Sequence, residues 1–204
     1  MRVIQVPVGD MQANAFIVFK DSSKEAFVVD PGADIEKICA RLEYEGISEV
    51  THILLTHGHF DHTGAVEGLV KQTGATVCMS RKDVKRAITE LGYRYSPPKG
   101  ALFIKEGDKI KVGSLEFEVI ETPGHSEGSV TFRCEDALFT GDTLFRDSCG
   151  RTDLPGCNGA DMMKSLKKLC ELPGDYEVYP GHMEATSLER ERRCNYFMQQ
   201  AAQG

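Results

Sequence analysis

The stretch ILLTHGHFDHTG, residues 53–64, begins with the apolar residues Ile53, Leu54 and Leu55 and continues into three histidines and an aspartate. The whole chain of 204 residues has six histidines, so half of them lie in this stretch. A short, continuously apolar run is typical of a strand that is buried on both faces of a sheet. The polar cluster that follows is therefore either a turn at the end of a buried strand or a metal site.

The spacing within the cluster favours a metal site. Side chains two positions apart in extended backbone point the same way, so His57 and His59 are expected to project together from the end of the strand. Asp61 and His62 are adjacent, near the expected start of a helix, and therefore diverge. Imidazole and carboxylate suit zinc, iron or manganese, and no thiolate is near enough to suggest a closed structural zinc site. The H-x-H-x-D-H pattern thus predicts ligands for two neighbouring ions.

Three further residues, like the histidine cluster, lie at the ends of expected strands. His125 lies in TPGHSEGS between two strand-like runs, Asp142 ends the apolar run in LFTGDTLF, and His182 ends another in YEVYPGH. Each lies next to a glycine at the end of an expected strand, which is where α/β folds place ligands. These residues are therefore candidates for the same site. His52 lies outside the pattern, and we predict a structural role for it, such as a hydrogen bond to a loop.

The composition is ordinary for a soluble globular protein, with 41% hydrophobic and 27% charged residues. The net charge of −7 argues against nucleic acid as a partner. No stretch is apolar enough to span a bilayer, and the N-terminal residues lack the apolar core of a signal peptide. The seven cysteines are scattered without a C-x-x-C pair, which suits reduced thiols. We therefore expect a cytoplasmic protein with no membrane or nucleic-acid partner. Apart from what composition indicates, we expect a small-molecule substrate and a monomer or small homo-oligomer.

Strand-like and helix-like patterns of apolar residues alternate along the chain, and no linker or repeat divides it. Expected strands are residues 3–8, 14–20, 25–30, 52–56, 75–80, 108–113, 115–122, 128–134, 137–142 and 176–181. Expected helices are residues 34–46, a segment from the histidine cluster to Gly74, 81–88, 161–172 and 185–200. Residues 88–102 are either a connector or a flap over a site. This order predicts two sheets packed face to face with helices outside.

THGHFDH, TPGHSEGS, FTGDTLF and YPGH, in this order and spacing, resemble the motifs of the metallo-β-lactamase superfamily over essentially the whole chain. The resemblance implies an α/β fold, the αββα four-layer sandwich of two mixed β-sheets with helices outside, formed by residues 1–204 as a single domain. It also implies two divalent metal ions, Zn²⁺ by preference, with Fe or Mn as alternatives. The residues that it assigns to the first ion are His57, His59 and His125. Those that it assigns to the second are Asp61, His62 and His182. Asp142 would bridge the two ions.

Residues 144–156, LFRDSCGRTDLPG, resemble the glyoxalase II-like thioester hydrolases, or hydroxyacylglutathione hydrolases, and the related sulfur dioxygenases. The implied activity is metal-dependent hydrolysis of a thioester, such as S-lactoylglutathione or a related acyl-thiol, by a metal-bridging hydroxide. Asp61 would orient this nucleophile and Asp142 would hold both ions, so both are implied catalytic residues. A thioester suits the chemistry because a thiol of pKa about 8.5 can leave as thiolate, whereas an amide needs a general acid.

Two departures from the hydrolase pattern concern the substrate. Met183 stands where the hydrolases usually have a glycine after the last histidine. The chain also ends one expected helix after His182, where full-length glyoxalase II has a C-terminal helical domain that helps to bind glutathione. The resemblance is therefore to the short, single-domain bacterial type, and glutathione specificity does not follow from it.

Two residues of the 144–156 stretch are candidate substrate contacts. Arg151 would hold a substrate carboxylate through a bidentate contact, or would instead form a buried structural pair with Asp153. Cys149 would touch a sulfur substrate, or would be an ordinary loop thiol. The structural alternative is preferred for both.

Three other activities remain as alternatives to thioester hydrolysis. An iron-dependent persulfide dioxygenase would use a facial triad, for which His57, His125 and Asp142 are available. A lactonase would open a ring with the same hydroxide. A serine hydrolase would use Ser126, in GHSEG, with Asp142 and His182. That motif needs a helix directly after the serine, and the residues that follow are strand-like. We expect thioester hydrolysis ahead of all three.

Overall fold

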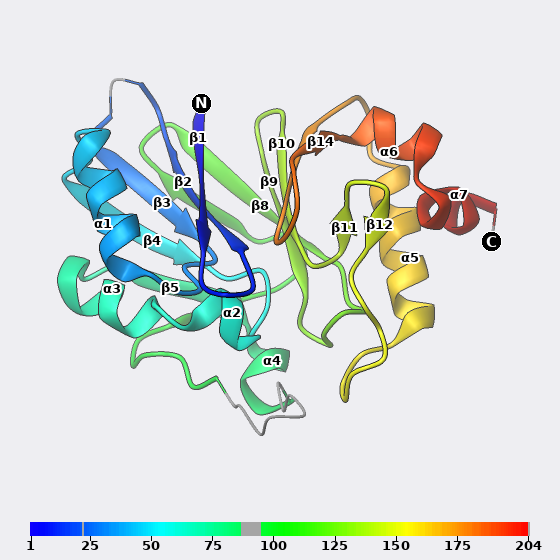
Figure 1. The fold of residues 1–204 in the computed structure, drawn as a ribbon, viewed down its shortest axis with the longest axis horizontal. Coiled ribbons are helices and arrows are strands. Elements are labelled where there is room, and N and C mark those ends of the chain that lie inside the picture. Colours follow the sequence, from blue (N-terminus) through cyan, green and yellow to red (C-terminus); the bar gives the residue numbers. More distant parts are fainter. Residues whose placement is uncertain (22, 87–94, 204) are drawn as a thin grey trace.

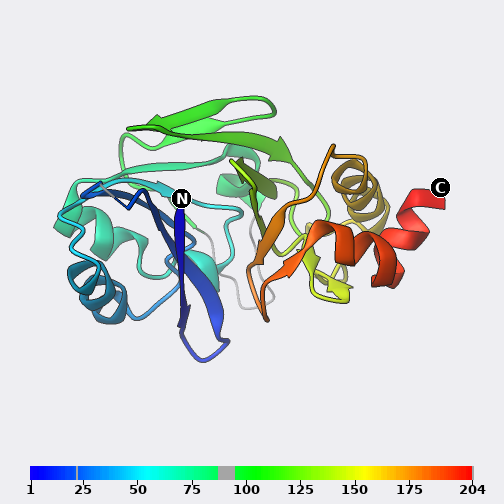
Figure 2. The ribbon, with the colours of Figure 1, turned by 90° about the horizontal axis from the view of Figure 1, so that it is seen from above.

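The computed structural model describes residues 1–21, 23–86 and 95–203. Two six-stranded sheets pack face to face and helices cover their outer faces. In Figure 1, α1 (Ile35–Tyr44) and α3 (Val66–Thr73) lie on one side of the molecule, and α5 (Gly159–Cys170) and α7 (Tyr196–Gln203) lie on the opposite side. Figure 2 shows the same layers from above, with the strands between the two groups of helices. The predicted αββα sandwich is confirmed.

The strands of the first sheet lie in the order of the sequence. They are β1 (Arg2–Val8), β2 (Ala13–Phe19), β3 (Glu25–Val29), β4 (Glu49–Leu54), β5 (Thr76–Ser80) and β6 (Leu102–Ile104). The first three are antiparallel, whereas β3 to β6 run parallel, so the sheet is mixed. All seven residues of β2 are buried because each of its faces is covered. Ile17 belongs to the core under the helices, and Phe16 to the core between the sheets.

The second sheet is also mixed, because one of its strand pairs is parallel. Its strands in spatial order are β14 (Thr186–Ser187), β13 (Glu177–Pro180), β10 (Ala137–Gly141), β9 (Val130–Cys134), β8 (Leu115–Glu121) and β7 (Lys109–Val112). β10 and β13 run parallel and the other neighbours antiparallel. Aromatic rings join the two sheets: Phe27 lies 4.4 Å from Phe117, and Phe16 lies 5.5 Å from Phe139, between centroids.

The carboxyl ends of β3, β4, β10 and β13 meet at one edge of the sandwich. The backbone N–H of Val130 donates to Thr56 O at 2.8 Å, which ties the ends of the two sheets together. On the other side of this edge, the N–H of Asn14 donates to Gly181 O at 2.7 Å. The N–H of Gly181 in turn donates to Gly141 O at 2.8 Å. Residues that follow these four strands are therefore brought close to one another.

The helix expected between the histidine cluster and Gly74 is two helices, α2 (Phe60–Thr63) and α3. The two helices separate at Gly64. The backbone there lies so close to that of Gly32 that a Cβ atom on residue 64 would lie 2.3 Å from Gly32 O. The helix expected at residues 161–172 begins at Gly159 instead. The side chain of Asn158 accepts hydrogen bonds from the backbone N–H groups of Ala160 and Asp161, at 2.9 and 3.2 Å, and so fixes the start of α5.

The expectation of one terminal helix over residues 185–200 is wrong. The chain first forms β14, then α6 (Leu188–Cys194) and then α7. The helices separate at Asn195, which is fully buried and whose amide donates to the carbonyl oxygens of Phe145 and Ser148, at 3.2 and 2.9 Å. These contacts with the hairpin of β11 (Leu144–Phe145) and β12 (Ser148–Cys149) hold Asn195 out of helical conformation.

The segment 88–102, predicted to be a connector or a flap, is described only in part, because residues 88–94 lie outside the described ranges. Tyr95 is buried, and β6 begins at Leu102. β6 was not expected, because a strand of three residues is too short to show an alternating pattern. The short helix α4 (Arg81–Arg86) follows β5 as predicted. Within residues 1–21, 23–86 and 95–203, no helix has the length and apolarity needed to cross a membrane.

Candidate metal centre

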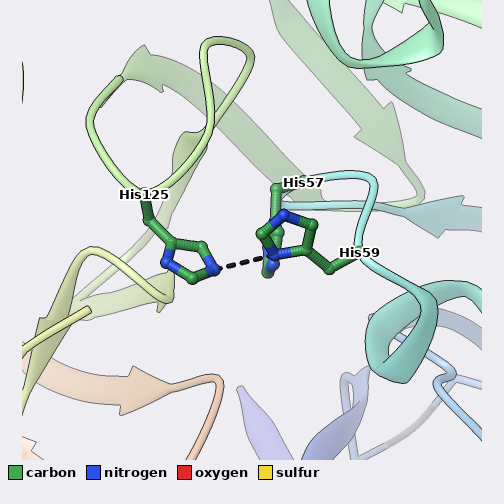
Figure 3. Close-up of side chains that lie close together, drawn as sticks. All are labelled: His57, His59 and His125. Carbon is green, nitrogen blue, oxygen red and sulfur yellow. Dashed lines mark hydrogen bonds between the residues drawn. The ribbon is translucent and has the colours of Figure 1, made fainter. Parts of the chain in front are cut away.

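The first three candidate ligands lie together at the end of β4. His57 follows the strand, His59 precedes α2, and His125 comes from the loop between β8 and β9. Figure 3 shows the rings turned toward one another, with His59 Nδ1 2.8 Å from His125 Nε2. The ring of His57 lies 4.6 Å from that of His59 and 4.9 Å from that of His125, between centroids. All three side chains are buried and offer nitrogen atoms that converge on one point, which is suitable for one cation.

The second group of candidate ligands lies beside the first. Asp61 and His62 belong to α2, and His182 follows β13. Asp61 Oδ2 lies 3.2 Å from His182 Nε2 and 3.6 Å from His62 Nε2. These three residues also converge closely enough to hold one cation.

Asp142 lies between the two groups. Its Oδ1 is 3.4 Å from His62 Nε2, and its Oδ2 is 3.4 Å from His125 Nε2. This close packing depends on Gly181, because a Cβ atom there would lie 2.2 Å from Asp142 Oδ1 and 2.7 Å from His62 Cε1. One carboxylate therefore reaches both groups of ligands, and the structure brings all seven predicted residues together.

The protein supplies no hydrogen-bond partner for three buried atoms of this cluster. Among the described residues, His57 Nε2, His62 Nε2 and Asp142 Oδ1 have none. Buried polar atoms are nearly always satisfied, so three unsatisfied atoms in one cluster indicate a missing binding partner. A divalent cation would satisfy both an imidazole lone pair and a carboxylate oxygen, and mixed imidazole and carboxylate ligands suit first-row transition metals. The residues present therefore fit divalent metal ions.

The hydrogen bonds around the cluster determine which nitrogen of each ring faces inward. Thr56 donates its hydroxyl to Asp30 Oδ2 at 2.6 Å, so its oxygen is free to accept the Nδ1 proton of His57 at 3.0 Å. His62 Nδ1 donates to Asp30 Oδ2 at 3.0 Å. With the Nδ1 protons placed in this way, the Nε2 atoms of both histidines point into the site, where each can bind a metal as the neutral imidazole.

His125 follows the same rule, because its Nδ1 donates to the carbonyl oxygen of Arg151 at 2.9 Å. The backbone of residues 150–153 (GRTD) therefore orients the candidate ligand His125. Asp30 was missed in the sequence, although it ends an apolar strand beside Pro31 and Gly32 and so has the same signature as the ligands. Asp30 accepts hydrogen bonds with both oxygens, from Thr56 and His62, which suits a supporting role.

A second missed residue is Asp83 in α4, which is buried. Its Oδ2 accepts from the N–H of Gly58, between two ligands, at 2.7 Å, and from the hydroxyl of Ser126 at 2.9 Å. Its Oδ1 accepts from the N–H of Gly128 at 2.7 Å. Asp83 thus joins the loop of His57 and His59 to the loop of His125. The hydroxyl of Ser126 serves this link, and a turn and then β9, rather than a helix, follow it, which disfavours Ser126 as a nucleophile.

We expect the Asp83→Asn variant to bind its first metal ion about 10- to 100-fold more weakly. In either orientation of the new amide, its NH₂ group would face the backbone N–H of Gly58 or of Gly128, so one hydrogen bond becomes a repulsion. Competition titration against a chelating dye measures the affinity. Ser126→Ala is the matched control, since it removes one hydrogen bond to Asp83 and leaves both backbone bonds in place. Unchanged affinity in a folded Asp83→Asn protein would contradict this role.

The pKa values of the cluster are strongly shifted. Burial and the neighbouring imidazoles hold the pKa of His57 well below its usual value. Burial, chiefly, lowers the pKa of His59 to about 4. Burial also acts on His62, but Asp142 and the hydrogen bond to Asp30 outweigh it and raise the pKa to about 9. Burial raises the pKa of Asp61, yet the hydrogen bond and charge of His182, together with His62, bring it to about 2. His57 and His59 are thus neutral, as ligands must be, whereas His62 carries a proton at pH 7.

We expect Zn²⁺ binding at pH 7 to release at least one proton per chain, because a metal ligand must be the neutral imidazole. One proton comes from His62, whose pKa of about 9 lies above the solution pH. His182 contributes as well, because burial is outweighed by its hydrogen bond to Asp61 and by the charge of Asp142, which raise its pKa. The apparent affinity should therefore increase as the pH rises toward 9. Calorimetric titrations in two buffers of different ionisation enthalpy give the number of protons. Binding that releases none at pH 7 would be inconsistent with a protonated His62.

A cleft of about 650 Å³ opens onto the ligands. Arg151 and Cys149 both line it, as the sequence suggested for substrate contacts. Arg151 makes a bidentate pair with Asp153, at 2.7 and 2.8 Å. The pair is exposed, so the expectation that it would be buried is wrong. Burial raises the pKa of Cys149 to about 11, so the thiol is protonated at neutral pH.

His52 lies within β4 and is half-buried. Its ring packs 5.8 Å from that of Phe27, between centroids, and its Nδ1 lies 3.2 Å from Thr51 Oγ1. These contacts fit the predicted structural role, although the hydrogen bond is to a strand residue and not to a loop.

Comparison with known proteins gives consistent results. The family model of the metallo-β-lactamase superfamily matches residues 8–182. The hydroxyacylglutathione hydrolase GloC of Haemophilus influenzae is 31% identical, over 97% of this chain and 98% of that protein.

Several solved structures share the fold, among them the following three. The B3 metallo-β-lactamase BLEG-1 is 34% identical with a TM-score of 0.87, over 97% of this chain and 99% of that one. TTHA1623, solved in a di-iron-bound form, is 35% identical with a TM-score of 0.80, over 96% and 100%. ETHE1 from Myxococcus xanthus is 29% identical with a TM-score of 0.81, over 96% and 84%. The fold, the two groups of ligands and these matches agree: the chain belongs to the metallo-β-lactamase superfamily of metal-dependent hydrolases.

Proposed function

We propose that this protein hydrolyses thioesters, and that its seven candidate ligands hold two divalent ions for that reaction. The observation that carries the proposal is the position of Asp142, whose two oxygens face the two groups of ligands. His57, His59 and His125 would hold one ion, and Asp61, His62 and His182 would hold the other. Two such ions would supply a hydroxide at neutral pH and polarise a carbonyl. The similarity to a hydroxyacylglutathione hydrolase supports the same class of substrate.

The walls of the cleft favour a thioester over an amide. Departure of an amine needs a general acid within reach of the leaving group. Among the described residues that line the cleft, the carboxylates and histidines all belong to the seven candidate ligands. A thiolate, in contrast, leaves without a proton, because the pKa of a thiol is about 8.5. The residues of this chain therefore bind and orient the substrate without having to donate a proton to it.

Zn²⁺ is the ion that we propose, because three imidazoles with carboxylates are a common zinc environment. The similarity to TTHA1623 in its di-iron form makes iron the alternative. We also propose a cytosolic location, which the seven free cysteines support.

The second candidate function is a persulfide dioxygenase, which the similarity to ETHE1 favours. That reaction would need one iron held by two histidines and an aspartate, such as His57, His125 and Asp142. It would leave the second group, with Asp61 and His182 3.2 Å apart, without a role. For this reason we rank it below hydrolysis.

The experiment that tests the proposal compares three reactions of metal-replete protein. Thiol release is measured with S-lactoylglutathione and with simple acyl thioesters. Oxygen uptake is measured with glutathione persulfide, and acid release is measured with a lactone. We expect thiol release alone, and its loss after chelation. Oxygen uptake with the persulfide while every thioester stays intact would overturn the proposal in favour of the dioxygenase.

A further inference from the structure

Met183, directly after the ligand His182, has a backbone conformation that methionine rarely adopts. Its φ is +70°, in the left-handed region that favours glycine. Hydrogen bonds hold this conformation: the side-chain amides of Asn14 and Gln5 donate to Met183 O, at 2.9 and 3.4 Å. Those bonds use only the backbone, so a glycine would make them equally well and without strain. The presence of a side chain here is therefore not explained by the backbone.

Packing within the protein does not explain this side chain either. Met183 is 55% exposed, so the protein itself covers less than half of it, and it lines the cleft that opens onto the ligands. Met11, in the turn between β1 and β2, is also 55% exposed and lines the same cleft. Strained residues and exposed apolar side chains gathered at one cleft are typical of a binding site. A molecule bound in the cleft would cover the side chains of Met11 and Met183.

The remaining walls of the cleft are also mostly apolar. Phe60, Phe145 and Leu154 line it together with the two methionines. Arg151 is the one cationic side chain outside the candidate ligands among its described lining residues, and its guanidinium is engaged by Asp153. A thiol carrier with two carboxylates, such as glutathione, would find little complementary charge here. An aliphatic or aromatic group would instead bury the exposed methionines.

We propose that Met183 and Met11 form an apolar seat that selects thioesters with an aliphatic or aromatic acyl group. This rests on the proposed thioester hydrolysis for its reaction, but the seat itself is a property of the cleft. Its volume of about 650 Å³ is enough for an acyl chain of several carbons together with the thioester. Because each buried methylene contributes to binding, kcat/KM should increase about threefold for each carbon added to the chain until the cleft is full.

The kinetic test uses straight-chain acyl thioesters of N-acetylcysteamine, from two to eight carbons, with S-lactoylglutathione as a polar comparison. In the wild-type protein we expect kcat/KM to increase with chain length and to exceed that for S-lactoylglutathione. In Met183→Gly and Met11→Ala the ratio of the octanoyl to the acetyl value should fall at least about tenfold. Met183→Gly should melt no lower than the wild type, since glycine suits the left-handed conformation. Tyr196→Ala, which removes an exposed side chain from α7 away from the cleft, should leave the ratio unchanged.

A binding measurement separates this inference from the proposed function. The S-octyl thioether of N-acetylcysteamine has no thioester carbonyl to cleave, and its affinity is measured by calorimetry. Weaker binding to Met183→Gly than to the wild type supports the apolar seat even where no thioester is hydrolysed. Equal binding to both proteins, or a chain-length dependence that survives in both variants, overturns it. Absence of all thioester hydrolysis overturns the proposed function alone.

Discussion

Replacing Asp142 with alanine should lower kcat/KM for a thioester by about 10³-fold or more, because one carboxylate serves both groups of ligands. In the structure its two oxygens lie 3.4 Å from His62 Nε2 and 3.4 Å from His125 Nε2. Without that carboxylate, the imidazoles of His62 and His125 lose the group that joins them. The variant should also retain fewer than two ions per chain after gel filtration. Thiol release and metal analysis of the same sample measure the two effects.

The matched control is Asp136→Ala, which removes an exposed carboxylate from the turn between β9 and β10. It should keep full activity and a full complement of metal. A second variant, Asp142→Asn, keeps the shape of the side chain and removes its charge, so it separates the loss of the ligand from the loss of packing. Full activity in Asp142→Ala would show that the seven residues do not form the catalytic centre.

Removal of the metal should abolish activity and lower the melting temperature by about 10 °C. The cluster brings Asp61 and Asp142 together with five histidines, and three of its buried atoms are unsatisfied, so a cation stabilises the folded state directly. With free metal about 1,000-fold above its dissociation constant, the stabilisation is about 4 kcal/mol. For a chain of this size each 1 kcal/mol shifts the melting temperature by about 2–4 °C.

Melting curves with chelator, without chelator, and after return of Zn²⁺ measure this effect. Asp142→Ala serves as the control, because its melting temperature should depend far less on the metal. Identical melting of the wild-type protein under all three conditions would be incompatible with a metal ion bound in the cluster.

Most of the candidate site could be predicted from the sequence because its residues share a local signature. His57, Asp142 and His182 each follow an apolar strand, and parallel strands bring such positions to one edge of a sheet. The sandwich could be predicted for a related reason, since β2 and the run of residues 53–55 at the end of β4 are apolar on both faces and must be covered on both. Asp30 has the same signature at the end of β3 and could have been included.

Other features depend on contacts that no local pattern records. Asp83 lies in RKDVKR, which has the composition of an exposed helix, and it is buried only because the loops of Gly58 and Gly128 close over it. Asn195 interrupts the terminal helices through hydrogen bonds to a hairpin some 50 residues earlier. The left-handed conformation of Met183 likewise arises from side chains of β1 and β2. Each depends on long-range packing that the local sequence does not contain.

Oxygen-18 labelling during turnover tests the central claim most directly, namely that a two-ion site in this chain hydrolyses thioesters with water. Metal-replete protein is given an acyl thioester in H₂¹⁸O under ordinary oxygen, and the released thiol and carboxylate are analysed by mass spectrometry. The account predicts one thiol per turnover, one ¹⁸O atom in the carboxylate, and no uptake of oxygen. No thiol from any thioester, together with ¹⁸O₂ entering a sulfur product from glutathione persulfide, would contradict it.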